Sequence, residues 1–347
     1  MAESQEAREV HRFITRVLIT AAIVALFALA WYLRGLLLLL FGSVLVSVIL
    51  RLIAKPIHTQ FRVTSGIALA IAALLVLAVI GLIFWLFGAE ISRQTEELEV
   101  MLPRAWQSFQ ARLDAAGWGD SFRQGVENFR ASALTTFGRF ALSVTNGIGD
   151  TILAIVGGIY LAAQPHLYKT GLLKLIPSDH RDVASDALDC ADLGLALWLR
   201  GRMVSMLVVG MLTAVGLYII GVPSWLSLGL LSGLLEFIPF LGPLISAVPA
   251  VLLALAHSPQ AALWTIALYL LVQQLEGNLI EPMIQQRAVR IPPLLLLFSI
   301  ITWALLFGIG GIVVAAPLTV VVFMLVKRLY VREALGTATP LPTDPSY

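Results

Sequence analysis

The chain has 347 residues, of which 59% are hydrophobic and 13% are charged, and its mean hydropathy is +0.90. Soluble domains carry about 25% charged residues, so this composition excludes an ordinary soluble protein and predicts that most of the chain lies in lipid. The formal net charge of +2 gives no reason to expect a nucleic-acid partner. The single cysteine, Cys190, excludes an internal disulfide.

Six apolar segments have the length of a membrane-crossing helix, which needs about 20 residues. They are residues 14–33, 35–54, 66–88, 140–163, 203–222 and 260–276. The first segment does not predict a cleavable signal peptide, because it has the length of a full span and no small-residue cleavage site separates it from the next. We therefore expect an all-α, polytopic membrane protein whose N-terminal spans occupy residues 1–91.

Between the third and fourth segments, residues 92–139 carry apolar side chains at helical spacing, for example Trp106, Phe109 and Leu113. This spacing predicts two amphipathic helices outside the bilayer. They could lie on the membrane surface, pack on a neighbouring subunit or form a small helical cap with a solvated face. Residues 140–335 would then form the core of the protein.

Two further apolar runs, residues 225–256 and 294–326, are too long for one span and too short for two. Each is interrupted near its middle by residues that break helices. The interruptions are Pro239, Gly242, Pro243 and Pro249 in the first run, and Gly308, Gly310, Gly311 and Pro317 in the second. Two half-length helices that fold back as a re-entrant hairpin account for the length of each run.

The distribution of Lys and Arg indicates which connections face the cytoplasm, because cytoplasmic loops are enriched in both. With a cytoplasmic N-terminus and two re-entrant hairpins, 16 of the 23 basic residues face the cytoplasm, and residues 164–202 form one cytoplasmic segment. The run 225–256 then enters from outside and the run 294–326 from inside. The count favours this arrangement over full crossings, in which Arg287 and Arg290 would lie outside.

Between residues 203 and 286 there is no Lys, Arg or Asp, and the acids are Glu236, Glu276 and Glu281. A carboxyl group at membrane depth usually faces a cavity or a partner and marks an ion or substrate path. Glu236 lies three residues before Pro239, where a broken helix would free backbone carbonyl groups, as in secondary transporters. The alternatives are a carboxyl group hydrogen-bonded across a helix or subunit interface and, for the other two acids, a position among cytoplasmic headgroups.

Other polar groups point less clearly to chemistry. Asn278 belongs to a polar cluster after span 260–276 that could line a pathway or lie at the membrane interface. Five aspartates between residues 178 and 192 could bind a metal, but without a calcium-type loop they favour a solvated cytoplasmic helix. Residues 336–347 predict a disordered tail.

The sequence argues against an enzyme. The Gly-Ile-Gly-Asp motif at 147–150 is typical of intramembrane aspartyl proteases, but no second aspartate occurs in any span to share a proton with Asp150. A zinc motif of the His-Glu-x-x-His type and a Walker-type glycine loop do not occur in the sequence. No cofactor or metal is therefore expected.

Several motifs follow one another in the C-terminal half: WLRG at 198–201, LEFIPFLGP at 235–243, AVPAV at 247–251, QLEGNLIEP at 274–282, GIGG at 308–311 and AAPL at 315–318. In this order and spacing, over residues 190–330, they resemble the autoinducer-2 exporter family of bacterial permease-like proteins. Residues 285–288 depart from the usual family sequence.

The resemblance implies a multi-pass, homo-oligomeric transporter of the bacterial inner membrane. Members of the family are linked to export of a quorum-sensing furanone and to sodium/proton antiport, so the resemblance does not fix the substrate.

We therefore expect a secondary transporter that exports a small polar solute or exchanges Na⁺ for H⁺. Its two hairpin breaks would meet near the bilayer midplane beside Glu236. The predicted pathway residues are Glu236, Pro239, Gly242, Pro243, Glu276, Asn278, Glu281, Gly308, Gly311 and Pro317. The alternative is a membrane scaffold or morphogenetic factor that does not transport and binds partners through residues 92–139.

Overall fold

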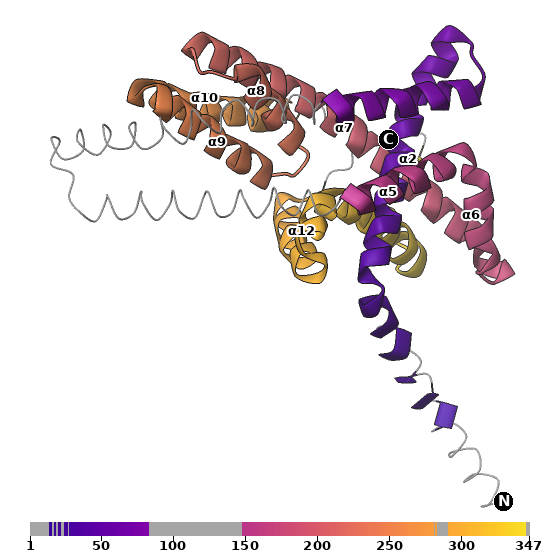
Figure 1. Ribbon diagram of the computed structural model, residues 1–347. Helices are drawn as coiled ribbons and strands as arrows, with labels where there is room; N and C mark the ends of the chain where they lie inside the picture. The colour runs from indigo at the N-terminus through magenta and orange to yellow at the C-terminus, as the bar shows by residue number, and fades with distance from the viewer. Residues whose placement is uncertain are drawn as a thin grey trace, which may run out of the picture.

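A computed structural model describes residues 14–82 except 16, 19, 22, 23 and 27, then residues 148–280, 282 and 291–344. Nearly all of these residues are helical, and no β-strand occurs among them. The labelled helices are α2 (Arg34–Phe61), α5 (Ile148–Ala163), α6 (Pro165–Lys174), α7 (Arg181–Ile220), α8 (Trp225–Leu235), α9 (Leu241–His257), α10 (Pro259–Leu275) and α12 (Pro293–Leu325) (Figure 1). The predicted amphipathic segment 92–139 lies outside the described residues.

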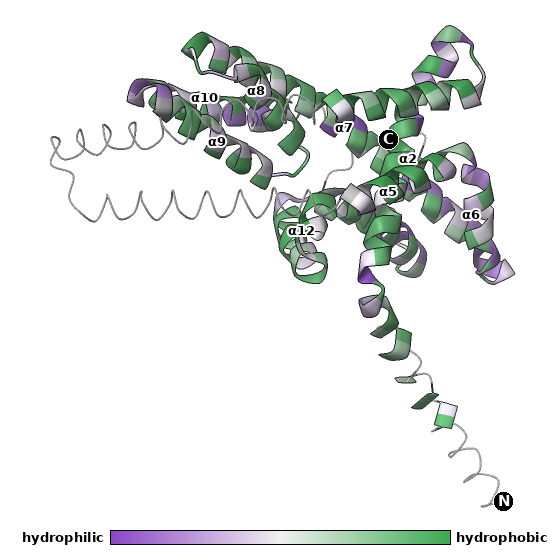
Figure 2. Cartoon of the chain, viewed as in Figure 1, coloured by the Kyte–Doolittle hydropathy of each residue, from purple (hydrophilic) through white to green (hydrophobic). Residues whose placement is uncertain are grey.

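Four of the described helices are long and apolar enough to cross a membrane, and the count rises to five with a bent pair. The four are Arg34–Phe61, Ser65–Leu82, Ser178–Ile220 and Pro293–Ala334; the pair is α5 and α6, which meet at 88°. Hydrophobic residues cover most of these helices, as Figure 2 shows. The all-α, polytopic character expected from the sequence is therefore confirmed, and α10, with 17 residues, lies at the lower limit of the length of a span.

Helix α7 is the element around which the others pack. Its 40 residues span about 60 Å. Towards its C-terminal end, Leu217 packs with Leu228 of α8 and Ala254 of α9. Towards its N-terminal end, Leu195 and Leu199 pack with residues of α2 and α12. The predicted cytoplasmic segment 164–202 and the predicted span from 203 are joined in one helix, because α7 runs without a break from 181 to 220.

The acidic residues at the N-terminal end of α7 pair with cations from three other segments. The pairs are Asp186 with Arg328 (3.3 Å), Asp189 with Lys169 (2.7 Å) and Asp192 with Arg51 (3.1 Å). All three cations belong to segments that the charge count assigns to the cytoplasm. These aspartates therefore tie the helices together at one end rather than forming a free acidic face.

The run 225–256 breaks at residues 236–240 and reverses direction. Tyr269 of α10 shares a hydrogen bond of 2.7 Å with the hydroxyl of Ser232 and donates one of 3.2 Å to the carbonyl of Ser246. In a straight helix these two serines would lie about 21 Å apart, so the chain between them folds back. The reversal is tight, because a Cβ atom on Gly242 would lie 1.9 Å from the Leu235 carbonyl oxygen.

The run 294–326 also folds back on itself, at Gly308. This glycine has φ 65° and ψ −144°, which interrupts α12 and which only glycine adopts readily. The indole nitrogen of Trp303 donates a 3.0 Å hydrogen bond to the hydroxyl of Thr319, although a straight helix would separate the two residues by about 24 Å. A Cβ atom on Gly311 would lie 2.0 Å from the Trp303 carbonyl oxygen, so both reversals depend on a glycine that contacts a backbone carbonyl.

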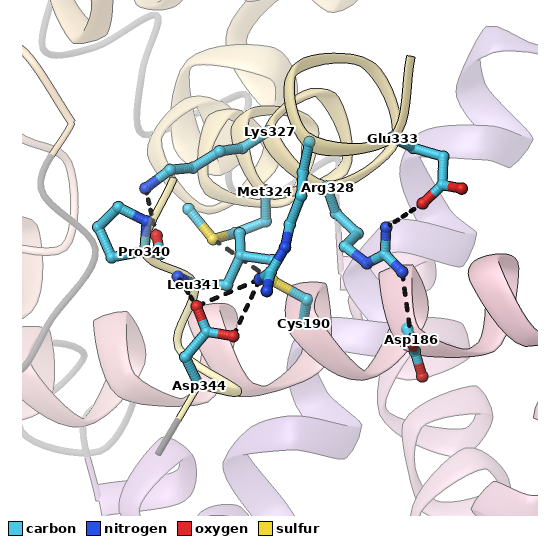
Figure 3. A network of polar contacts seen from close by, with 10 residues as sticks. Asp186, Cys190, Met324, Lys327, Arg328, Glu333, Pro340, Leu341 and Asp344 are labelled. Atoms are coloured by element: carbon cyan, nitrogen blue, oxygen red, sulfur yellow. Dashed lines mark hydrogen bonds and ion pairs between the residues drawn. The ribbon is translucent and has the colours of Figure 1, made fainter. Parts of the chain in front are cut away.

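Residues 336–344 of the tail that was expected to be disordered contact the helices. Leu341 is buried against α7 and α12, and the side chains of Lys327 and Arg332 bond to the tail (Figure 3). The composition of the tail is polar and proline-rich, but one leucine and one aspartate fix it to the helices.

Candidate functional site

A cavity of about 930 Å³ lies between α7, the break after α8, α10 and the start of α12. Its lining is mostly apolar, as in most ligand cavities. Three charged side chains enter it from three different helices: Arg202, Glu236 and Glu276. The cavity therefore has a mostly apolar wall and one cluster of charged side chains.

The polar cluster is an ion-paired triad with Arg202 at its centre. The Nη2 atom of Arg202 donates to Oε1 of Glu236 at 2.7 Å, and its Nη1 atom donates to Oε1 of Glu276 at 3.2 Å. The side chains are 13%, 1% and 8% exposed, respectively. Such low exposure means that all three groups have lost most of their contact with bulk water, and their mutual contacts replace it.

The remaining oxygens of the two carboxyl groups have different surroundings. Oε2 of Glu276 accepts a 2.7 Å hydrogen bond from the amide of Gln273. Oε2 of Glu236 is buried and has no hydrogen-bond partner among the described residues. A buried carboxylate oxygen without a donor is costly, so this atom is the part of the triad best placed to accept a proton or a cation.

The charges of the triad do not balance. One guanidinium faces two carboxyl groups, so the cluster has a net charge of −1 when both are ionised. Glu236 and Glu276 also cap the C-terminal ends of α8 and α10, where the backbone dipoles add partial negative charge. An uncompensated buried charge is unfavourable, so the arrangement attracts one positive charge, either a bound proton or a cation.

Local sequence explains how the two carboxyl groups come together. The break after Leu235 turns the chain inward, and the backbone amide of Glu236 still bonds to the carbonyl of Ser232. Tyr269 fixes both arms of the reversal to α10. The end of α10 then presents Glu276 about two turns beyond Tyr269.

The structure places only some of the predicted pathway residues at this cavity. Pro239 and Pro243 line it together with Glu236 and Glu276, while Gly242 permits the turn behind them. Asn278 is exposed and donates to the side chain of Gln274 at 2.9 Å, so it does not line the cavity. Glu281 lies outside the described residues.

The three residues predicted from the second run lie elsewhere. Gly308 borders a separate cavity of about 350 Å³, whose lining includes Arg34 and Leu38. Gly311 and Pro317 are buried within α12. In the described part of the chain the two breaks therefore do not share a cavity, contrary to the prediction, because α12 lines the main cavity only near its start, at Pro293 and Leu296.

Arg202 is the member of the triad that sequence reasoning missed. The prediction started the span at residue 203 and so assigned Arg202 to the cytoplasm, leaving Glu236 without a cation. The geometry fits both interpretations of Glu236, because its carboxyl group is bonded to Arg202 across a helix interface and also lines the cavity. The available signal was the apolar stretch before Arg200, including Trp198, which indicates that the helix does not begin at 203.

Comparisons with known proteins agree with the motifs. Residues 20–330 match the family model described as AI-2E family transporter. The chain is 32% identical to "Putative transport protein YrrI" of Bacillus subtilis over 174 residues, which cover 50% of this chain and 49% of YrrI. A "Putative transport protein" of Haemophilus influenzae is 25% identical over 295 residues, which cover 79% of this chain and 82% of that protein.

One relative whose name includes its cargo matches this chain over a shorter stretch. "AI-2 transport protein TqsA" of Escherichia coli is 35% identical over 95 residues, which cover 27% of this chain and 28% of TqsA. The chain spans about half the length of several of the curated relatives that it matches, including YrrI (49%) and YueF of Bacillus subtilis (53%).

Proposed function

Because this chain belongs to the AI-2E family of transporters, we propose that it is a secondary membrane transporter whose ion or substrate site is the cavity around Arg202, Glu236 and Glu276. The observation that carries the proposal is the triad itself. One buried guanidinium faces two buried carboxyl groups, so the site can exchange one positive charge for another. No ATP-binding motif in the sequence offers another energy source.

The triad supports exchange of Na⁺ for H⁺ as the leading activity. A sodium ion at Glu236 Oε2 would neutralise the excess negative charge, as would a proton on the same oxygen. Both cannot occupy that oxygen together, and this competition is the basis of antiport. Arg202 would hold the two carboxyl groups in place and shift between them as the charge on Glu236 changes.

Export of a small polar solute is the second candidate. The cavity of about 930 Å³ is larger than an ion needs, and Gln273 and Arg202 supply hydrogen-bond donors in its wall. The name of TqsA gives autoinducer-2 as the cargo of that protein. In this mode the proton or cation at Glu236 would drive the movement of the solute.

We also propose that both folded-back runs are re-entrant hairpins in the inner membrane of a bacterium, entering from opposite sides. The arms of the first run, α8 and α9, measure about 16 and 26 Å. Each is shorter than the roughly 30 Å of hydrocarbon. In a homo-oligomer, neighbouring subunits would cover the faces of these short helices that do not contact lipid.

Flux through liposomes tests the proposal. Purified protein reconstituted with an entrapped pH dye should acidify or alkalinise the lumen when a Na⁺ gradient is imposed, and Glu236→Gln should abolish this flux. Glu333→Gln is the matched control, since Glu333 is exposed and pairs only with Arg328 among the described residues. Normal flux in Glu236→Gln would refute the coupling role of this carboxyl group.

The scaffold alternative makes the opposite prediction. It expects no flux of sodium, protons or small polar solutes in wild-type liposomes. It also expects cellular phenotypes to follow deletions within residues 92–139 rather than substitutions in the triad.

A further inference from the structure

The C-terminal residues 336–344 cross the end of the helix bundle, and two of them, Leu341 and Pro342, are buried there. Leu341 is 1% exposed and packs with Cys190 and Ala191 of α7 and with Val320 and Met324 of α12. Figure 3 shows this leucine between the two helices. Because the same side chain contacts both helices, it holds them together.

Polar contacts on either side of Leu341 hold the segment in register. The ammonium group of Lys327 donates to the Pro340 carbonyl at 2.6 Å, and Arg332 donates to the Asp344 carboxylate at 2.9 Å. The Leu341 amide donates to the same carboxylate at 2.9 Å. The Arg332 guanidinium beside Asp344 holds the pKa of that carboxyl group below its usual range, so the contact remains charged at neutral pH.

The apolar cluster around Leu341 also forms part of the wall of the transport cavity. Trp198 and Ile291 pack against that cluster, and both residues also line the cavity. A displacement of Leu341 would therefore loosen two residues of the cavity wall. The two helices also contact each other directly here, through Cys190 and Met324 (3.9 Å), and Asp186 of α7 pairs with Arg328 just beyond α12 (3.3 Å), so the segment adds to these contacts.

We propose that residues 336–344 form a strap that holds α7 against α12 beside the cavity. Release of the strap opens the cavity to hydrophilic solutes from the end of the helix bundle that the strap crosses. The proposal rests on the transport cavity assigned above but not on the identity of its cargo. Apart from the buried Leu341 and Pro342, the contacts of the strap are local and partly exposed, which is typical of a segment that opens without global unfolding.

Cys190, the single cysteine of the chain, provides a built-in reporter of the strap. It is fully buried beneath Leu341 and Met324, so a thiol reagent should react with it slowly in the wild-type protein. Leu341→Ala should speed this reaction about tenfold or more, because it removes a buried anchor. Thr343→Ala is the matched control in the same segment; Thr343 is exposed, and its loss should leave the labelling rate unchanged.

A second reporter measures whether the cavity itself opens. Ala247 lines the cavity, so Cys190→Ala/Ala247→Cys reports entry of a membrane-impermeant maleimide. Adding Leu341→Ala should speed this labelling as well. Unchanged labelling at Cys190 would show that the strap does not cover α7, and faster labelling at Cys190 with unchanged labelling at position 247 would show that it does not control the cavity.

A milder variant keeps the test decisive if Leu341→Ala does not fold. Asp344→Asn removes only the ionic anchor and should speed Cys190 labelling about twofold to fivefold. Labelling requires no transport, so wild-type protein that labels as expected but shows no flux would refute the proposed function and leave the strap intact. Flux that is normal in wild type with labelling unaffected by either variant would refute the strap alone.

Discussion

At the scale of single residues, the cavity depends on the position of one arginine. Arg202 is the only cation that contacts Glu236 and Glu276 among the described residues. Removing one partner of a buried ion pair leaves an uncompensated charge and costs about 3–5 kcal/mol. Loss of Arg202 leaves two buried carboxyl groups facing each other rather than one, so their mutual repulsion adds to the cost.

Arg202→Met should therefore lower the free energy of unfolding by about 3–5 kcal/mol, measured by thermal unfolding in detergent. The matched control is Arg200→Met, because Arg200 lies on the same helix two residues away and is exposed. Adding Glu236→Gln and Glu276→Gln should restore part of the lost stability. An Arg202→Met protein as stable as the control would show that the triad is not formed.

The two chain reversals each require a glycine. A methyl group on Gly242 or Gly311 would collide with a backbone carbonyl, at 1.9 and 2.0 Å respectively, and a carbonyl within a turn cannot move aside as a side chain can. Each Gly→Ala substitution should cost at least about 1–3 kcal/mol. Gly171→Ala in α6 is the control, since nothing lies within 4 Å of its added Cβ, and it should be neutral or slightly stabilising. Equal stability of all three variants would contradict the folded-back geometry.

At the scale of elements, the reversal between α8 and α9 is fixed to α10 by the hydroxyl of Tyr269. Tyr269→Phe leaves the Ser246 carbonyl and the Ser232 hydroxyl without this partner and should cost about 1–3 kcal/mol. Hydrogen exchange should become faster in residues 236–246, the segment that the hydroxyl holds. Exchange that rises equally in α2, which does not contact Tyr269, would mean that the effect is global rather than local.

The elements also show what could be predicted from the sequence. Length and Pro/Gly content predicted that 225–256 and 294–326 are interrupted, because these are properties of the local chain. Sequence could not predict where the interruptions lie in space, and Gly308 borders a different cavity from Glu236. The aspartates at 178–192 favoured a solvated helix, and the next span was expected to start at 203. The structure joins both in α7, and the partners Arg51, Lys169 and Arg328 come from other segments, which the sequence alone does not pair.

At the scale of the whole molecule, α7 connects the cavity to the ion pairs of Asp186, Asp189 and Asp192 and to the strap. Its C-terminal part carries the hairpin and α10, its middle carries Arg202, and its N-terminal part carries the aspartates and Cys190. A displacement of α7 relative to α12 would therefore change the cavity and the strap together. This arrangement is consistent with a transporter that alternates by moving one group of helices against another.

The central claim, that the cavity is the transport path, is tested most directly by blocking it. Cys190→Ala/Ala247→Cys protein is labelled to completion with a bulky maleimide, checked by mass spectrometry, and reconstituted for the sodium-driven proton flux assay. Cys190→Ala/Leu263→Cys serves as the control, because Leu263 is 69% exposed on α10 and does not line the cavity. We predict that labelling abolishes flux at position 247 and leaves it unchanged at position 263. Equal flux before and after complete labelling at position 247 would contradict the account.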